Sequence, residues 1–167
     1  NVRRMIETIN TLDADIIVTP EMSICGYPPR DLLHCSGFVH GCEEAATQVG
    51  YACKDKMVLV SHPRMDAVSR RTRNSTSVFL HGEIIATCDK KLLPSYDVFD
   101  EKRYFESGDT SCVFSYASHT IGIVICEDFW RGLDTNAAPT YDFNPVDDLI
   151  KSGCDILISP SASPFVT

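Results

Sequence analysis

Three loops in the sequence carry residue types that could act together in covalent catalysis. In one of them, Cys126 follows the apolar run 121–125 and precedes the polar and aromatic stretch 127–130. A thiol at the carboxyl end of a buried strand is where α/β folds present a nucleophile, and backbone N–H groups of the following turn can hold an oxyanion. A cysteine in such a strand can also be a small apolar packing residue. Cys126 is therefore a candidate nucleophile whose role depends on its neighbours.

A second loop supplies a carboxylate. Glu21 follows the short apolar run 15–20, which has the composition of a strand covered on both faces. A carboxylate that emerges from a buried strand can be partly desolvated, and it can then act as a base near neutral pH. The alternative is a loop glutamate exposed to water.

A third loop offers a cation. Lys90 and Lys91 follow a predicted strand, and side chains in a strand alternate between its two faces. Lys90 therefore shares a face with Ile84, Ala86 and Cys88. We expect Lys90, and not Lys91, to be the buried lysine.

A buried ammonium group is costly unless it is paired with carboxylates. Glu21 and Glu101 are the partners that we expect for Lys90. The alternative is that both lysines end a hairpin in water.

Other catalytic arrangements are not favoured. The five histidines are scattered, so the sequence indicates neither a Ser-His-Asp nor a Cys-His arrangement. It contains no glycine-rich phosphate loop and no His/Cys/Asp cluster with the spacing of metal ligands. We expect no metal site and no bound nucleotide within these residues.

Alternating helices and apolar strands must position the three loops. Strands are predicted at 15–20, 57–61, 75–80, 83–89, 112–116, 120–126 and 155–159. Helices are predicted at the start of the chain, over 38–53, and from Asn144-Pro145 to about Gly153. Hairpin turns are expected at His81-Gly82 and over 117–119. This order indicates an α/β fold with a mixed sheet.

Composition limits the classes of partner. The 167 residues, 44% of them apolar, suit one domain with a substantial core. The net charge of −8, without a basic run, argues against a nucleic-acid or anionic-membrane surface. No apolar stretch approaches the roughly 18 residues that span a bilayer, and we expect a cytoplasmic location. The eight cysteines include no C-x-x-C pair and are expected to be mostly reduced, a secreted disulfide framework being the alternative.

Taken in chain order, the three loops resemble the Glu-Lys-Cys signature of the nitrilase superfamily. Four longer motifs are similar to the glutaminase domain of glutamine-dependent NAD synthetases. They are Pro-Glu-x-x-x-x-Gly-Tyr-Pro-Pro at 20–29, Lys-x-x-Leu-Pro-x-Tyr-x-x-Phe-Asp-Glu-Lys-Arg-Tyr-Phe at 90–105, Ile-Cys-Glu-Asp-x-Trp at 125–130 and Ser-Ala-Ser-Pro-Phe at 161–165. The resemblance runs from about Ala14 to Phe165.

The resemblance implies a role for each matching residue. Glu21 corresponds to the general base, Lys90 to the lysine that stabilises the tetrahedral intermediate, and Cys126 to the nucleophile. Glu101 corresponds to a second carboxylate that orients the lysine and the scissile amide. The positions implied to hold glutamine or to line its pocket are Tyr27, Tyr96, Phe99, Glu127 and Ser163.

The resemblance also implies the architecture, a four-layer α-β-β-α sandwich. Residues 1–167 are then a partial domain with no second domain, because the family domain has an additional first strand and a further segment after the last motif. Ser95 and Ser159 depart from the family, which commonly has Asn at these positions.

The implied reaction is hydrolysis of the glutamine side-chain amide through a cysteine thioester, with the ammonia used to make NAD from the adenylated nicotinate dinucleotide. The implied partners are glutamine, a synthetase domain of the same longer chain, and further copies of the chain in a homo-oligomer. The synthetase domain would use ATP and Mg²⁺, whereas these residues would need no cofactor. The alternatives are a nitrilase-type amidase acting on another amide and a catalytically silent binding module on the same fold.

Overall fold

The strands form two sheets in the computed structural model, which describes residues 1–130 and 141–163. One sheet has the order β1-β2-β3-β4, with the strands Ile16–Val18, Met57–Met65, Thr72–Leu80 and Glu83–Asp89. The other has the order β5-β6-β7, with the strands Cys112–Tyr116, His119–Ile123 and Ile156–Ile158. The pairs β1-β2 and β6-β7 are parallel and the other pairs are antiparallel. The predicted mixed topology is thus confirmed, but it is divided between two sheets.

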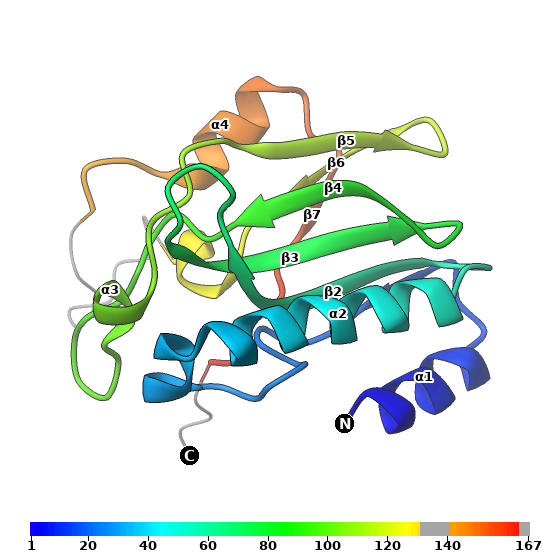
Figure 1. Ribbon diagram of the computed structural model, residues 1–167. Coiled ribbons are helices and arrows are strands. Elements are labelled where there is room, and N and C mark those ends of the chain that lie inside the picture. The colour runs from blue at the N-terminus through cyan, green and yellow to red at the C-terminus, as the bar shows by residue number, and fades with distance from the viewer. Residues whose placement is uncertain (131–140, 164–167) are drawn as a thin grey trace, which may run out of the picture.

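Helices cover the outer faces of both sheets (Figure 1). The helices α1 (Val2–Thr11) and α2 (Ser36–Ala52) lie against the first sheet, and α4 (Pro145–Lys151) lies against the second. Three short helical turns, η1 (Arg30–His34), α3 (Glu101–Tyr104) and η2 (Cys126–Phe129), interrupt the loops. Within residues 1–130 and 141–163, no helix is long and apolar enough to cross a membrane.

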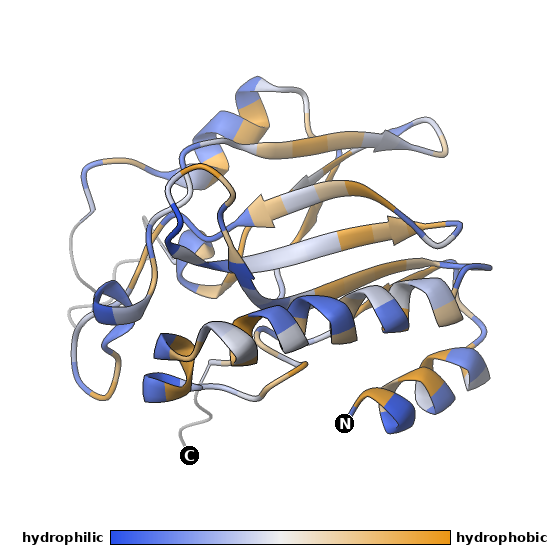
Figure 2. Cartoon of the chain, viewed as in Figure 1, coloured by the Kyte–Doolittle hydropathy of each residue, from blue (hydrophilic) through white to orange (hydrophobic). Residues whose placement is uncertain are grey.

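Strand β2 shows why the chain forms four layers. Its side chains are buried on both faces, and successive residues point to opposite sides. Val58 and Val60 pack with the helices, whereas Met57 and Leu59 pack in the core between the two sheets. Figure 2 shows the corresponding pattern, with apolar residues along the strands and both polar and apolar residues around α1 and α2. The expected α-β-β-α arrangement is confirmed.

The two predicted hairpins turn through left-handed backbone. His81 and Gly82 have φ values of 54° and 83°, as the predicted two-residue turn requires. The second turn consists of Ala117 and Ser118 alone, with φ values of 46° and 69°. The prediction that this turn includes His119 is wrong, because His119 already pairs with Tyr116 in the sheet.

Two of the eight cysteines are disulfide-bonded. Cys88 on β4 and Cys112 on β5 form a bond that joins the two sheets, with their Cα atoms 5.3 Å apart. The other six cysteines are free thiols. The expectation of mostly reduced cysteines therefore holds for six of them, and no spacing in the sequence selects this pair.

We expect Gly50→Ala to destabilise the protein by about 1–3 kcal/mol. A Cβ atom at Gly50, on α2, would lie 2.1 Å from the ring of Phe79, which is buried on β3. Gly41→Ala on the same helix is the control, because its Cβ atom would meet nothing within 4 Å. Alanine is also the better helix former, so the control should be neutral or stabilising by up to about 1 kcal/mol. Urea denaturation of both variants tests this, and equal stability would show that α2 can move away from Phe79.

Candidate active site

Glu21 lies in the loop that follows β1, and only 3% of its surface is exposed. Its Oε1 atom accepts hydrogen bonds from Lys90 Nζ at 2.8 Å and from Asn74 Nδ2 at 2.7 Å. Its Oε2 atom accepts a hydrogen bond from the backbone N–H of Ala162 at 3.2 Å. The carboxylate is therefore fixed by groups from three distant parts of the chain.

Lys90 follows β4 and is 1% exposed. Its Nζ atom lies 2.8 Å from an oxygen of Glu21 and 2.8 Å from an oxygen of Glu101. Burial acts to lower the pKa of Lys90, but these two carboxylates outweigh it, and the pKa is raised. Lys90 is thus held as a cation inside the protein.

The side chain of the neighbouring Lys91 does not contact Glu21 or Glu101. Its Nζ atom donates to Ser111 Oγ at 2.9 Å and lies 3.7 Å from a carboxylate oxygen of Asp148. The expected choice between the two lysines agrees with this geometry. Ile84 is also expected on the strand face of Lys90, but it is 53% exposed. A bulge in the β3-β4 pairing interrupts the alternation of side chains between Ile84 and Lys90.

Glu101 is the first residue of α3 and is 4% exposed. The oxygen that contacts Lys90 also accepts a hydrogen bond from the hydroxyl of Tyr27 at 2.8 Å. Burial raises the pKa of Glu101, and the Lys90 ammonium opposes this shift. Burial and the nearby carboxylate also raise the pKa of Tyr27, so its hydroxyl remains a donor.

Cys126 lies on a sharp turn. The predicted strand 120–126 is wrong over its last three residues, because β6 ends at Ile123. The N–H of Cys126 donates to the Pro160 carbonyl at 2.9 Å, and its φ of 47° is in the left-handed region that residues other than glycine rarely adopt. Strained backbone of this kind is concentrated at functional sites. The Sγ atom lies 3.4 Å from Ser163 Oγ.

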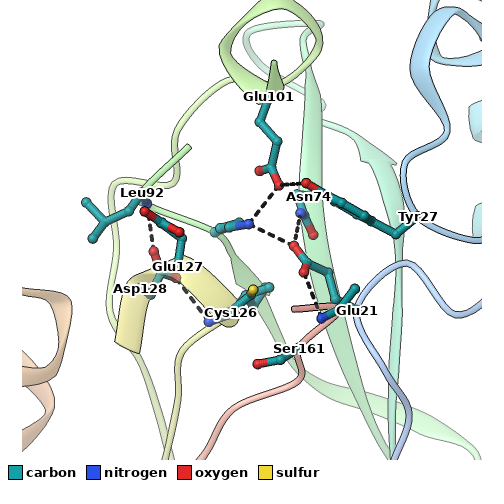
Figure 3. A network of polar contacts seen from close by, with 12 residues as sticks. Glu21, Tyr27, Asn74, Leu92, Glu101, Cys126, Glu127, Asp128 and Ser161 are labelled. Atoms are coloured by element: carbon teal, nitrogen blue, oxygen red, sulfur yellow. Dashed lines mark hydrogen bonds and ion pairs between the residues drawn. The ribbon is translucent and has the colours of Figure 1, made fainter. Parts of the chain in front are cut away.

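One cavity of about 190 Å³ brings the expected residues together. Every residue expected in the site except Glu101 lines it: Glu21, Tyr27, Lys90, Tyr96, Phe99, Cys126, Glu127 and Ser163. Glu101 contacts Lys90 but lines a neighbouring cavity of about 240 Å³. Figure 3 shows the network that links Glu101, Tyr27, Asn74 and Glu21, with Cys126 beside it. Four segments far apart in the sequence thus share one site.

Glu127 provides a buried negative group in the same cavity. It is 4% exposed, and its carboxylate accepts hydrogen bonds from the hydroxyl of Tyr96 at 3.0 Å and from that of Tyr141 at 2.8 Å. Burial, followed by the contact with Glu127, raises the pKa of both tyrosines. The cavity can therefore accept a cationic group beside a carboxylate that two phenols orient.

Sequence reasoning missed several residues of the site, and the side chains of three of them hold its charged groups or its backbone. Asn74 donates a hydrogen bond to Glu21, and Tyr141 donates one to Glu127. Asp128 accepts hydrogen bonds from the backbone N–H groups of Leu92 and Ile125. Asn74 could have been noticed as a polar residue beside the predicted strand 75–80, which in fact begins at Thr72. Pro164 and Phe165 of the last motif lie outside the described residues.

The described part of the chain offers no metal-binding cluster. Across residues 1–130 and 141–163, no group of three or more His, Cys, Asp and Glu side chains is placed to hold a metal ion. The arrangement instead combines a thiol, a carboxylate and an ammonium group, which are the parts needed for nucleophilic attack on an amide.

We expect Cys126 to be protonated near neutral pH in the free site. Burial, and then the Glu21 carboxylate, raises the pKa of the thiol, although Lys90 acts in the opposite direction. Alkylation by iodoacetamide should therefore rise with pH, with a midpoint above about 8.5, the ordinary cysteine value. Mass spectrometry of the peptide that contains Cys126 measures the rate, and the C126A variant identifies the peptide. A midpoint below neutral pH would instead indicate a thiolate that exists before substrate binds.

Known proteins resemble the chain first at the level of fold. The structure matches a variant of the Nesterenkonia AN1 amidase from the nitrilase superfamily with a TM-score of 0.77 at 17% identity, covering 99% of this chain and 61% of that one. The fold is therefore that of the nitrilase superfamily. No protein-family model matches the chain.

Relatives with higher sequence identity are named glutamine-dependent NAD(+) synthetases. The chain is 36% identical over 172 residues to the glutamine-dependent NAD(+) synthetase of Xanthomonas campestris, covering 99% of this chain and 29% of the relative. The solved glutamine-dependent NAD+ synthetase of Acinetobacter baumannii in complex with ADP is 32% identical, with a TM-score of 0.86, covering 99% of this chain and 30% of that one. The chain is thus a homologue of part of the glutamine-dependent NAD(+) synthetases, and the resemblance in the motifs is confirmed. It spans about 30% of the length of these relatives.

Proposed function

We propose that residues 1–167 are part of the glutamine-hydrolysing domain of a glutamine-dependent NAD synthetase. The observation that carries this proposal is the Lys90 ammonium, held at 2.8 Å from both Glu21 and Glu101, in a cavity that it shares with Cys126. The names of the relatives support glutamine as the substrate.

In the proposed mechanism, Glu21 takes the proton from Cys126, because the raised pKa of the thiol makes a base necessary. The sulfur then bonds to the carbon of the glutamine side-chain amide, and the carbonyl oxygen becomes an oxyanion. The backbone N–H of Cys126 is already bonded to the Pro160 carbonyl. We assign the oxyanion to Lys90 together with backbone N–H groups of the turn that follows Cys126.

The intermediate breaks down when its C–N bond is cleaved. Glu21 returns the proton to the leaving nitrogen, so that ammonia departs and a thioester remains on Cys126. Glu21 then takes a proton from a water molecule, which attacks the thioester carbon. Glutamate is released and the thiol is restored, so the reaction consumes one water and no cofactor.

Selectivity for glutamine would come from the charged end of the substrate. Glu127, oriented by Tyr96 and Tyr141, is a suitable partner for the α-ammonium group. Tyr27 and Phe99, whose ring centroids lie 6.2 Å apart, would together form one wall of the pocket beside the aliphatic part of the substrate. Ser163 lies 3.4 Å from the sulfur and would contact the substrate near the reacting amide.

The released ammonia would be used by a synthetase domain of a longer chain, which would amidate the adenylated nicotinate dinucleotide with ATP and Mg²⁺. We assign none of the described residues to ATP or Mg²⁺. We also propose that the intact enzyme is a cytoplasmic homo-oligomer that binds neither nucleic acid nor membranes.

Incubation of the full-length protein with glutamine tests the proposal. The expected products are glutamate and ammonia, together with a transient mass increase on the peptide that contains Cys126. Hydrolysis of other amides but not of glutamine would favour a nitrilase-type amidase with a different substrate. Binding of glutamine without turnover or adduct would indicate a silent module and would contradict the proposed mechanism.

A further inference from the structure

The carboxylate of Asp128 is 2% exposed and contacts both the loop that follows β4 and the turn that carries Cys126. Its Oδ1 atom accepts hydrogen bonds from the N–H groups of Leu92 at 2.6 Å and Lys91 at 3.0 Å. Its Oδ2 atom accepts a hydrogen bond from the N–H of Ile125 at 3.1 Å. Figure 3 shows Asp128 between Leu92 and the turn that carries Cys126. A single side chain thus binds backbone from two separate loops.

The backbone N–H groups that Asp128 binds lie next to Lys90 and Cys126 in the sequence. Lys91 and Leu92 directly follow Lys90, and Ile125 directly precedes Cys126. Lys90 extends from the first sheet and Cys126 from the second, and no strand pairing among the described residues joins these two sheets. The distance between ammonium and sulfur therefore depends on contacts made by side chains. The Cys88–Cys112 bond is one such contact, the bond from Ala162 N–H to Glu21 is a second, and Asp128 adds a third that binds the backbone directly beside Lys90 and Cys126.

We propose that Asp128 is a positioning residue that fixes Lys90 relative to Cys126 by holding the backbone beside each of them. A buried carboxylate that accepts several backbone hydrogen bonds is a rigid connection, because each unmade bond would leave a buried donor unpaired. The positive charge of Lys90 also favours the ionised carboxylate, although burial raises the pKa of Asp128 to about 6. The proposal rests on the proposed function, in which both groups act on one substrate amide.

Asp128→Asn in the full-length protein tests this role. The amide keeps one oxygen for Leu92 and Lys91 but presents an NH₂ group to the N–H of Ile125, so the contact on the cysteine side is lost. A shift of about 1 Å in reacting groups can reduce a rate about a hundredfold. We expect kcat for glutamine hydrolysis to fall roughly ten- to hundredfold. The KM for glutamine should change less than about threefold, because Asp128 does not line the substrate cavity.

Asp155→Asn is the matched control. Asp155 also accepts a hydrogen bond from a backbone N–H, that of Thr120 at 2.8 Å, at the opposite end of β6. This variant should keep the kcat of the unmodified protein. A kcat for D128N within about threefold of the unmodified protein would overturn the proposal, as would an equal loss of kcat in D155N. If the unmodified protein does not hydrolyse glutamine, the proposed function fails instead.

A second measurement does not depend on the variant folding. Amide hydrogen exchange of the unmodified protein should show slow exchange at Leu92 and Ile125, comparable to Leu59 in the core. Exchange at the rate of the exposed loop residue Val68 would overturn the proposal, because the two N–H groups would not be held. This readout needs no catalysis, so it tests Asp128 separately from the proposed reaction.

Discussion

Cys126→Ala in the full-length protein should abolish glutamine-dependent NAD synthesis but spare synthesis from added ammonia. The substitution removes the atom that we propose to form the thioester, and among the described residues that line the cavity no other carries a thiol. The hydroxyl of Ser163 lies 3.4 Å from the sulfur, but it is a weaker nucleophile at neutral pH. Loss of a nucleophile that acts as part of a catalytic unit typically reduces turnover by about 10⁴-fold or more.

The ammonia measurement separates the reaction from the fold. In the proposed function the synthetase chemistry belongs to another domain, so ammonia supplied externally should bypass the lesion. The substitution should leave the fold nearly unchanged, because the thiol faces a cavity and its loss creates little new empty space. Cys35→Ala, at an exposed cysteine, is the control and should keep both activities. Loss of both activities in folded C126A would mean that the cysteine has another role, and retention of both would reject the mechanism.

The principal catalytic candidates could be found from the sequence because each follows an apolar strand. The ends of such strands can be located from the apolar runs, and parallel or mixed α/β sheets present side chains there. That reasoning makes Glu21, Lys90 and Cys126 candidates, and their order in the chain, which resembles the Glu-Lys-Cys signature, is what selects them together. It does not establish their contacts, because a sequence pattern cannot measure how two sheets pack.

The residues that were missed act through distant partners. Asn74 binds a carboxylate 53 positions away, and Asp128 binds backbone N–H groups up to 37 positions away. A backbone donor has no signature in the sequence, so its acceptor cannot be assigned by residue type. The bulge beside Ile85 and the early end of β6 are also tertiary features. Strand β6 ends at Ile123, two residues before the apolar run does, and the left-handed turn at Cys126 follows.

The second large effect concerns stability. We expect Lys90→Met to inactivate the enzyme and to reduce its free energy of unfolding by about 3–5 kcal/mol. The ammonium lies 2.8 Å from both Glu21 and Glu101, and all three side chains are at most 4% exposed. Methionine fills a similar volume, so the loss would arise chiefly from two buried carboxylates left without their cation. Lys91→Met is the control, because Lys91 pairs at 3.7 Å with Asp148, which is half exposed, and its loss should cost less than about 1 kcal/mol.

The pH dependence of the stability of the K90M variant shows whether unpaired charge causes the loss of stability. Burial raises the pKa of Glu101 even beside Lys90, and removal of the cation should raise the folded-state pKa of Glu101 further. A group whose pKa is higher in the folded state stabilises the fold below its unfolded value, about 4.3 for Glu, and this stabilisation is lost as the pH rises. The difference in stability from the unmodified protein should therefore be larger at about pH 8 than at about pH 5.

Adding Glu101→Gln to K90M removes one of the unpaired charges and should recover part of the loss at the higher pH. Urea denaturation of the single and double variants at both pH values measures these effects, and a deficit that is independent of pH and unchanged by the second substitution would show that packing, and not charge, is what Lys90 contributes.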